Sequence, residues 1–375
     1  MSNKLSGDDT VLIVGGGLAG LSLAILLAQK GYGVHLWEKG QYPRHKVCGE
    51  YISTESLPFL KRLGLGEELP KWPSIQQFYL TSEHGYSGTC TLDTGGVGVS
   101  RYHLDYLLYQ KAISLGVEVA MNKSGKNIYW DEGNKHYLVK PNKGLDQHFK
   151  LVIGSFGRNN GLLPLAPTPK KYLGVKYHIA EGPAVNTIEM HHFEGGYCGV
   201  SAVEGQQYCL CYLVDAKQLQ RFKGDIDSLE KSVLSANPFL KERLQSARTF
   251  QGVRTANIVF GSTSLDGISY PLTGDALGFI PPITGNGMSL AFRSATTLFP
   301  WIEEYLEGNL TREKLLQYQI HYEEQYLRKR IQRGIFLHQL ITKRNPLVQQ
   351  ALLKGLTHFP GLMRLSAKMA VGQPF

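Results

Sequence analysis

A glycine-rich turn between two apolar runs restricts the fold of this chain more than any other feature of its sequence. Residues 11–14, VLIV, have the apolar, β-branched character of a buried parallel strand. The glycines of 15–20, GGGLAG, follow at once, and residues 18–30 then have helical character. A second apolar run, 34–37, leads to Glu38, 18 residues after the last glycine of the turn. This order predicts a strand–turn–helix–strand unit that binds a dinucleotide.

The three glycines in G-x-G-x-x-G spacing each have a separate physical role in such a unit. Gly15 permits the tight turn, Gly17 lets the backbone approach a pyrophosphate, and Gly20 lets the helix pack closely on the strand. The free N–H groups at the start of the helix favour a phosphate, and Glu38 can accept hydrogen bonds from a ribose. The contacts predicted at this end of the cofactor are Gly15, Gly17, Leu18, Ala19, Gly20, Glu38 and Lys39.

A basic stretch, YPRHKVCGEYIS, follows the predicted ribose-binding acid directly. A cation just beyond the second strand would neutralise a pyrophosphate or hold an extended cofactor, whereas the alternative is an ordinary basic surface loop. Farther along, Arg101 begins an amphipathic helix that Gly116 ends. The contacts predicted in this part of the chain are Arg44, Cys48, Gly49 and Arg101.

A second glycine-bearing segment, GDALGFIPPITGNGMSLAF, spans 274–292. Residues 268–272 are expected to form a strand, so Asp275 would lie at its carboxyl end, where ligands bind in open α/β sheets. The carboxylate would accept hydrogen bonds from a ribityl chain, and the glycines would let backbone N–H groups reach a flat ring. A helix is expected from Met288, and Pro300 should bend or end it. The contacts predicted here are Gly274, Asp275, Pro282, Gly285, Asn286 and Gly287.

Together these segments resemble the FAD-dependent monooxygenase superfamily, which includes aromatic hydroxylases of the para-hydroxybenzoate hydroxylase type, geranylgeranyl reductases and flavin-dependent halogenases. The resemblance covers roughly residues 10–306 and rests on VGGGLAGLSLAILLAQKGYGVHLWEK, on PRHKVCGE with SRYHLDYLL, and on GDALGFIPPITGNGMSLA. It implies FAD as the cofactor, with Gly285, Asn286 and Gly287 facing the isoalloxazine ring. It also implies an α/β fold, in which an antiparallel β-sheet substrate domain is inserted into a discontinuous, Rossmann-like FAD-binding domain of the glutathione-reductase type and helices follow.

The predicted domain organisation follows from this resemblance and from the strand pattern of the middle of the chain. Alternating segments between 175 and 215 read as consecutive strands of one antiparallel sheet. The FAD-binding domain is predicted to comprise residues 1–72, 97–165 and 250–308. The β-sheet substrate domain is predicted to comprise 73–96 and 166–249, and the C-terminal helical segment 309–375.

The first hypothesis for function is a monooxygenase that hydroxylates an aromatic, polyketide-like or otherwise apolar metabolite through a flavin hydroperoxide. The alternative is an enzyme similar to geranylgeranyl reductases that reduces isoprenoid double bonds, with Cys48 as a proton donor. A flavin-binding protein without turnover is the third hypothesis. Halogenation is disfavoured, because the chain lacks the Trp-x-Trp-x-Ile-Pro signature of the halogenases. Its four tryptophans are Trp37, Trp72, Trp130 and Trp301.

The residues that would act on the substrate and the electron donor are less well defined. Candidates for a catalytic role are Cys48, Tyr197 and His191, and for the inward-facing histidine a satisfied core residue is the competing interpretation. NAD(P)H as a transient donor is left open, because Phe156 stands where aromatic hydroxylases carry an aspartate. No metal site is expected.

Composition limits the partners and the compartment. The net charge of +9 is concentrated after residue 310, where eleven Lys and Arg face three Glu, so nucleic-acid binding is not expected. The basic C-terminal helices would cap the substrate cavity or contact a membrane surface or an acidic carrier protein. Five cysteines without disulfide or zinc spacing, and no apolar run long enough to span a membrane, indicate a cytoplasmic protein.

Overall fold

The computed structural model describes residues 10–157, 161–163, 172–246, 254–342, 346–370 and 375. A parallel sheet with strand order β10-β1-β2-β6 carries the predicted nucleotide-binding unit. Its first strand is fully buried because it lies between two parallel neighbours. The strands are β1 (Val11–Val14), β2 (Val34–Glu38), β6 (Glu118–Met121) and β10 (Leu151–Gly154).

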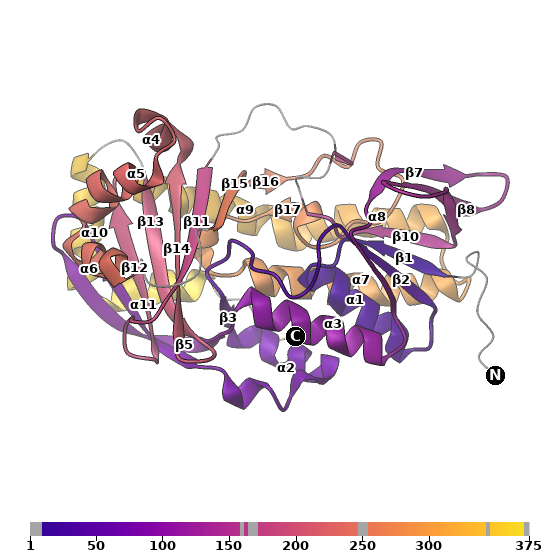
Figure 1. Ribbon diagram of the computed structural model, residues 1–375, viewed down its shortest axis with the longest axis horizontal. Coiled ribbons are helices and arrows are strands. Elements are labelled where there is room, and N and C mark those ends of the chain that lie inside the picture. Colours follow the sequence, from indigo (N-terminus) through magenta and orange to yellow (C-terminus); the bar gives the residue numbers. More distant parts are fainter. Residues whose placement is uncertain (1–9, 158–160, 164–171, 247–253, 343–345, 371–374) are drawn as a thin grey trace.

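The helix that follows the glycine turn is α1 (Leu18–Gln29), and it packs against α3 (Arg101–Ser114) and α7 (Gly287–Leu306) (Figure 1). Because α1 has a helix on either side, its residues from Leu18 to Leu27 are all buried, which explains why its sequence is apolar on every face. The chain leaves it through Gly31, whose φ of +87° favours glycine. The predicted strand–turn–helix–strand unit is confirmed.

The strand expected over 268–272 is wrong. Only Leu272 pairs, in an isolated parallel bridge with Gly154. The N–H of Gly154 donates to Pro271 O at 2.8 Å, and the N–H of Thr273 donates to Gly154 O at 2.9 Å. Pro271 has no N–H to extend a ladder, so the pairing stays this short. The bridge nevertheless brings Asp275 to the carboxyl edge of the parallel sheet.

A second, larger sheet has the strand order β15-β11-β14-β13-β12-β4-β5-β3. The four strands expected between 175 and 215 are confirmed, and they pair antiparallel with one another. The sheet as a whole is mixed, however, because β12 runs parallel to β4. Its strands are β3 (Tyr51–Ser53), β4 (Ser74–Thr81), β5 (Ser87–Gly98), β11 (Tyr172–Ile179), β12 (Thr187–Phe193), β13 (Gly196–Val203), β14 (Gln207–Asp215) and β15 (Arg254–Ile258).

Helices cover one face of this large sheet, beside a separate core that includes Val175, Val200 and Tyr212. They are α4 (Ala216–Arg221), α5 (Ile226–Ser232) and α6 (Pro238–Ser246). The opposite face contacts Glu50 through Lys176 in one part and packs against Leu353 and Met363 of the C-terminal helices in another. The predicted domain bounds stay predictions, and β3 and β15, from segments assigned to the FAD-binding domain, pair at the two edges of the large sheet.

A small antiparallel sheet lies beside the parallel one and consists of β7 (Gly125–Asp131), β8 (His136–Pro141) and β9 (Gln147–Phe149) (Figure 1). Other short elements include α2 (Leu57–Leu60), β16 (Gly261–Ser262), β17 (Gly278–Phe279) and two 3₁₀ turns, η7 (Gly274–Ala276) and η8 (Pro282–Thr284).

The C-terminal part is helical, as expected. Helix α7 continues through Pro300 to Leu306, so the prediction that the helix ends at this proline is wrong. Four helices follow, and in the described part of the chain no helix is long and apolar enough to cross a membrane. They are α8 (Arg312–Tyr322), α9 (Arg328–Thr342), α10 (Pro346–His358) and α11 (Pro360–Ala370).

Candidate functional site

The glycine turn after β1 is packed too closely for side chains at two of its glycines. Gly15 has a φ of +112°, and a Cβ there would overlap the carbonyl of Ser155. A Cβ on Gly20 would overlap the carbonyl of Gly15, so helix α1 can start here only with glycine at both positions. Gly17 caps α1, and the nearest atom to a Cβ on it is the ammonium of Lys46, at 3.8 Å. An open helix N-terminus with an ammonium group above it fits a pyrophosphate.

Glu38, at the end of β2, is buried and accepts hydrogen bonds from the N–H groups of Gly16 and Gly40, both at 2.8 Å. Its Oε1 also pairs with Arg44 Nη1 at 2.5 Å. Burial alone would raise the pKa of Glu38, but the hydrogen bond and charge of Arg44 lower it to about 2. Glu38 is therefore an anchored anion beside the turn, while Lys39 is exposed. That Glu38 binds the ribose and Arg44 lies along the cofactor stay predictions.

The second glycine-bearing segment meets the first in space. Gly274, with a φ of +64°, lies so close to α1 that a Cβ on it would be 2.9 Å from Ala19 Cβ. Its N–H donates to Ser294 Oγ on α7 at 2.8 Å. Asp275 follows and is exposed, which suits a carboxylate that binds hydroxyl groups. The two strand ends, more than 250 residues apart in sequence, thus line one site.

The Gly-Asn-Gly step forms the N-terminus of α7. Gly285 has a φ of +66°, and a Cβ there would lie 3.6 Å from the ring of Tyr51. Asn286 is buried and caps the 20-residue helix, whose first residue is Gly287. Pro282 begins the preceding turn and is exposed. Sequence reasoning missed Tyr51, although it stands directly after the Cys-Gly-Glu element.

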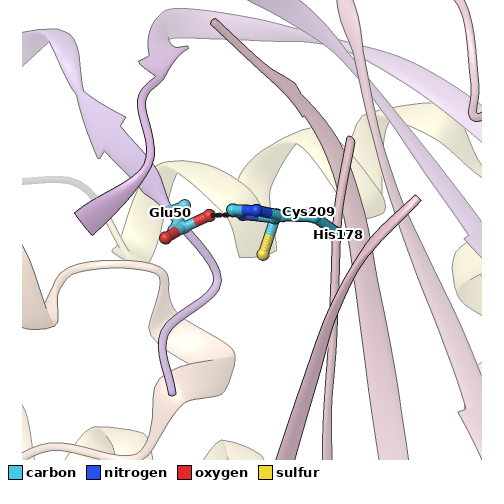
Figure 2. Close-up of side chains that lie close together, drawn as sticks. All are labelled: Glu50, His178 and Cys209. Atoms are coloured by element: carbon cyan, nitrogen blue, oxygen red, sulfur yellow. Dashed lines mark hydrogen bonds and ion pairs between the residues drawn. The ribbon is translucent and has the colours of Figure 1, made fainter. Parts of the chain in front are cut away.

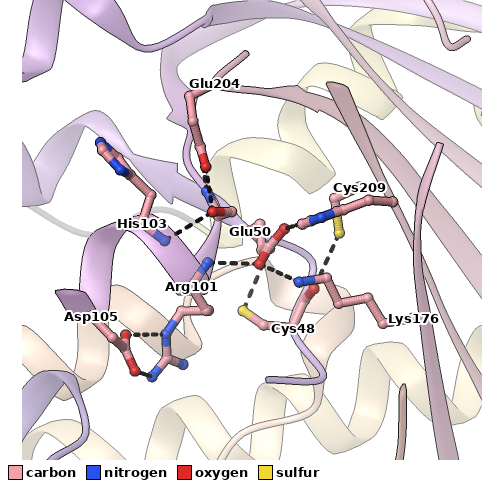
Figure 3. Close-up of polar contacts among 10 residues, drawn as sticks. Cys48, Glu50, Arg101, His103, Asp105, Lys176, Glu204 and Cys209 are labelled. Atoms are coloured by element: carbon pink, nitrogen blue, oxygen red, sulfur yellow. Dashed lines mark hydrogen bonds and ion pairs between the residues drawn. The ribbon is translucent and has the colours of Figure 1, made fainter. Parts of the chain in front are cut away.

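A cluster of charges joins the basic stretch to α3. Asp105 is fully buried and pairs with Arg101 through two hydrogen bonds of 2.6 and 2.9 Å (Figure 3). Lys46 Nζ lies 3.1 Å from the same carboxylate. Burial raises the pKa of Asp105, and Arg101 and Lys46 lower it below its ordinary value. Two cations share one carboxylate, so an excess positive charge faces the glycine turn and suits a diphosphate.

Glu50, one residue before β3, is the centre of a second buried cluster. It is fully buried and has a φ of +55°, rare for a residue with a side chain. One carboxylate oxygen binds the ammonium of Lys176 and accepts the N–H of Arg101 at 2.7 Å. The other lies 2.7 Å from His178 Nε2 (Figure 2). We call Glu50, Lys176 and His178 the Glu50 network; it ties the Cys48 loop to β11.

Glu50, His178 and Cys209 also place one oxygen, one nitrogen and one sulfur within 4.8 Å of one another. Such donors can bind zinc. The ammonium of Lys176, however, already supplies the positive charge next to Glu50, and the thiol of Cys209 donates to the carbonyl of Cys48 at 3.3 Å. The geometry is that of a buried ion pair.

The three catalytic candidates have different surroundings. Cys48 is half-buried in the loop before Glu50, and burial raises the pKa of its thiol. Tyr197 is buried against Ile283, in the turn before Gly285. Gly49, which is predicted as a cofactor contact and not as a catalytic residue, is exposed between Cys48 and Glu50. These residues therefore border the predicted flavin loops.

His191, in contrast, belongs to the opposite face of the large sheet. It is fully buried between Thr81 Oγ1, at 2.8 Å, and Glu189, at 3.0 Å. Glu189 in turn pairs with Arg243 of α6. The structure thus gives His191 a role in the sheet–helix packing and does not bring it to the flavin loops.

The sheet face that carries Lys176 has only small residues at its centre. Lys176, Cys211, Gly199 and Met190 are successive cross-strand neighbours, so they share this face. Gly199 and Cys211 are partly exposed although they lie on inner strands. A Cβ on Gly199 would meet only two backbone oxygens, both at 3.9 Å. We call this space the Gly199 hollow; sequence analysis did not find it.

Phe156 follows β10, beside the glycine turn. Its ring lies within 2.8 Å of a Cβ built on Gly154 and contacts Tyr270 edge to face at 6.3 Å. An apolar ring stands here in place of a carboxylate, so this position offers no hydrogen-bond acceptor to a nicotinamide donor.

Comparison with known proteins agrees with this geometry. Residues 8–150 match a family described as FAD binding domain. Conditioned medium factor receptor 1 of Dictyostelium discoideum is 23% identical over 355 residues, which cover 84% of this chain and 68% of that protein. A flavin-dependent halogenase of Armillaria mellea is 23% identical over 368 residues, which cover 81% of this chain and 69% of the halogenase.

Among solved structures, p-nitrophenol 4-monooxygenase from Pseudomonas putida has the same fold. It superposes with a TM-score of 0.77 at 15% identity and covers 98% of this chain and 97% of its own. The expected cofactor, FAD, and the expected superfamily are confirmed by the matched domain and by these relatives. The chain is an FAD-dependent oxidoreductase, similar to FAD-dependent monooxygenases and flavin-dependent halogenases.

Proposed function

We propose that this oxidoreductase is a monooxygenase that hydroxylates an aromatic or otherwise apolar metabolite. The observation that carries the proposal is the Gly199 hollow. It lies on the sheet face that is turned toward Glu50, Tyr51 and the Gly285 loop. Its floor consists of a glycine and a short thiol, and Met190 borders it. A partly exposed, mostly apolar sheet surface of this kind suits a flat hydrophobic substrate.

The protein's own residues would bind FAD, orient the substrate and exclude water. The glycine turn and the Lys46–Arg101 charges would hold the diphosphate, and the N-terminus of α7 would stabilise negative charge on a reduced ring. FAD, when bound, supplies the redox chemistry with dioxygen. The large sheet covers the site, which shields reactive species from water.

Halogenation and the reduction of apolar double bonds are the two alternative reactions. Halogenases occur among the relatives, but the chain lacks their Trp-x-Trp-x-Ile-Pro signature. A reductase that saturates apolar double bonds would need a neutral proton donor near the ring. Cys48 fits that need, because burial raises the pKa of its thiol and keeps it protonated.

One experiment separates these reactions. Purified FAD-bound protein is reduced with NADPH or dithionite, mixed with isotopically labelled dioxygen and a panel of phenols and polyketides, and analysed by mass spectrometry. Incorporation of one labelled oxygen atom into a product supports the proposal. A brominated product in the presence of bromide, or anaerobic saturation of an isoprenoid without oxygen incorporation, would show that it is wrong.

Filling the hollow tests its role in this reaction. Gly199→Leu places a side chain in open space without backbone strain. We expect substrate turnover to fall at least about tenfold, with the FAD content and the melting temperature unchanged. Gly66→Leu is the matched control, because a Cβ there meets only Lys61 Cγ at 3.8 Å, outside the site. Equal turnover in the two variants would contradict the assignment of the hollow.

A further inference from the structure

The last part of the chain combines positive charge with exposed apolar side chains. From Arg328 to Phe375 the sequence has nine Lys and Arg and no Asp or Glu. Phe359, Leu362 and Leu365 are 61%, 52% and 56% exposed, which is high for residues of this size. With Lys354, Arg364 and Lys368, which are also exposed, they form what we call the α10–α11 surface.

The two helices present this surface on one side of the molecule. Leu353 of α10 and Met363 of α11 are buried in one cluster with Leu80 and Cys90, from the strands β4 and β5. Both helices therefore pack on the same face of the sheet, and their other sides point away from it. Figure 1 shows α10 and α11 together at the end of the molecule opposite the four-stranded sheet.

We infer that the α10–α11 surface docks on an anionic lipid bilayer. The bulky apolar side chains would enter the boundary between headgroups and acyl chains, as those of interfacial amphipathic helices do. The flanking cations would extend their charged ends to lipid phosphates. Apolar insertion and charge attraction are two separate contributions, and stable attachment to a membrane needs two.

The charges that face these helices leave the surface positive. Asp93 of β5 pairs with Arg364 and lies 4.0 Å from Lys368. The ammonium of Lys354 lies 6.0 Å from the ring centre of Tyr86, a contact that does not neutralise its charge. Three cations thus face one carboxylate.

A lipid surface fits these features better than an acidic protein does. An acidic carrier protein would satisfy the cations but would leave Phe359, Leu362 and Leu365 against polar groups. A second copy of the chain would cover the apolar side chains but would bring like charges together. A bilayer satisfies both, and an apolar substrate of the proposed reaction would partition into it.

The test uses the full FAD-bound protein and sedimentation with vesicles of phosphatidylcholine alone or mixed with phosphatidylglycerol. We expect binding to the mixed vesicles and little to phosphatidylcholine alone, with loss of binding at high salt. Leu362→Ser/Leu365→Ser should weaken binding about tenfold or more for each side chain removed. Lys354→Gln/Lys368→Gln should weaken it and abolish the preference for phosphatidylglycerol.

The control is Val185→Ser/Leu145→Ser, which removes two side chains that are 56% and 87% exposed outside these helices. Retained FAD absorbance shows that each variant is folded. The inference is overturned if the protein does not sediment with mixed vesicles, or if Leu362→Ser/Leu365→Ser binds them like the parent. It is also overturned if the parent only dimerises through this surface in analytical ultracentrifugation, or binds only an acidic acyl carrier protein.

Discussion

At the scale of single residues, Glu38 shows how one buried carboxylate organises the glycine turn after β1. Its oxygens accept the N–H groups of Gly16 and Gly40 and bind Arg44. Each contact requires the ionised form, because a protonated carboxyl would lose acceptor capacity and leave the Arg44 charge uncompensated. The conformation of the glycine turn is therefore coupled to the charge of one residue.

Lowering the pH should remove the contribution of Glu38 to the stability of the fold over a defined pH range. The pKa of Glu38 is about 2 in the folded protein against an ordinary value of 4.5, so its stabilisation is present above about pH 4.5 and is lost as the pH falls toward 2. Glu189, whose pKa is also about 2, acts in the same direction. Glu38→Gln should therefore lose part of the acid dependence of stability.

Urea unfolding at a series of pH values in this window measures the effect, with Glu242→Gln, exposed on α6, as the control. An unchanged acid dependence in Glu38→Gln would contradict the assigned cause.

At the scale of elements, α7 connects the two parts of the second glycine-bearing segment. Its N-terminus carries the Gly285 loop, and about two turns later Ser294 reaches back to η7. Ser294 Oγ accepts the N–H of Gly274 at 2.8 Å, lies 3.0 Å from Thr273 Oγ1, and is buried. The position of Asp275 thus depends on a helix that begins twelve residues later.

Ser294→Ala should loosen this connection. It leaves the partly buried N–H of Gly274 without its acceptor, which costs about 1 kcal/mol of stability, and FAD affinity should fall as well. Urea unfolding and flavin fluorescence on release measure the two effects. Thr296→Ala is the control, because the hydroxyl of Thr296 donates within its own helix, to Phe292 O at 3.0 Å. Equal effects of the two changes would contradict this role of Ser294.

At the scale of the whole molecule, the Glu50 network joins the nucleotide-binding half to the large sheet. Lys176 is 2% exposed and Glu50 is fully buried, so the pair is withdrawn from water. Arg101, at the start of α3, donates its N–H to the same carboxylate. The loop before β3, the start of α3 and strand β11 are therefore held together by one buried anion.

Lys176→Met should remove the cation and leave Glu50 buried without its main partner. We expect a loss of about 3–5 kcal/mol in stability and easier release of FAD. Adding Glu50→Gln to the same chain should recover part of that loss, because the uncompensated charge is then gone. Urea unfolding measures both.

The control is Lys135→Met, which removes an exposed pair with Glu132 and should cost less than about 1 kcal/mol. A loss in Lys176→Met no larger than in this control would show that the network does not hold the two halves together.

Sequence alone determined the features that depend on neighbouring residues. The glycine spacing, the apolar strand before it and Glu38 after it define a local unit, because backbone sterics and helix-end charges act over a few residues. The strands between 175 and 215 followed from alternation for the same reason. Local rules failed where tertiary contacts outweighed them, as at Pro300 within α7 and at Leu272, whose single bridge replaces the expected strand.

Only the tertiary structure decided which distant residues meet. Glu50 and Lys176 are 126 residues apart, and they lie toward opposite ends of the strand order of the large sheet, one just before β3 and the other on β11. The Gly199 hollow exists because β11, β14, β13 and β12 align four residues in one row, and strand order is not encoded by alternation. His191 lies on the sheet face that α4, α5 and α6 cover, and alternation did not predict that either. A one-dimensional pattern fixes which side chains share a face, whereas the path of the whole chain fixes what that face touches.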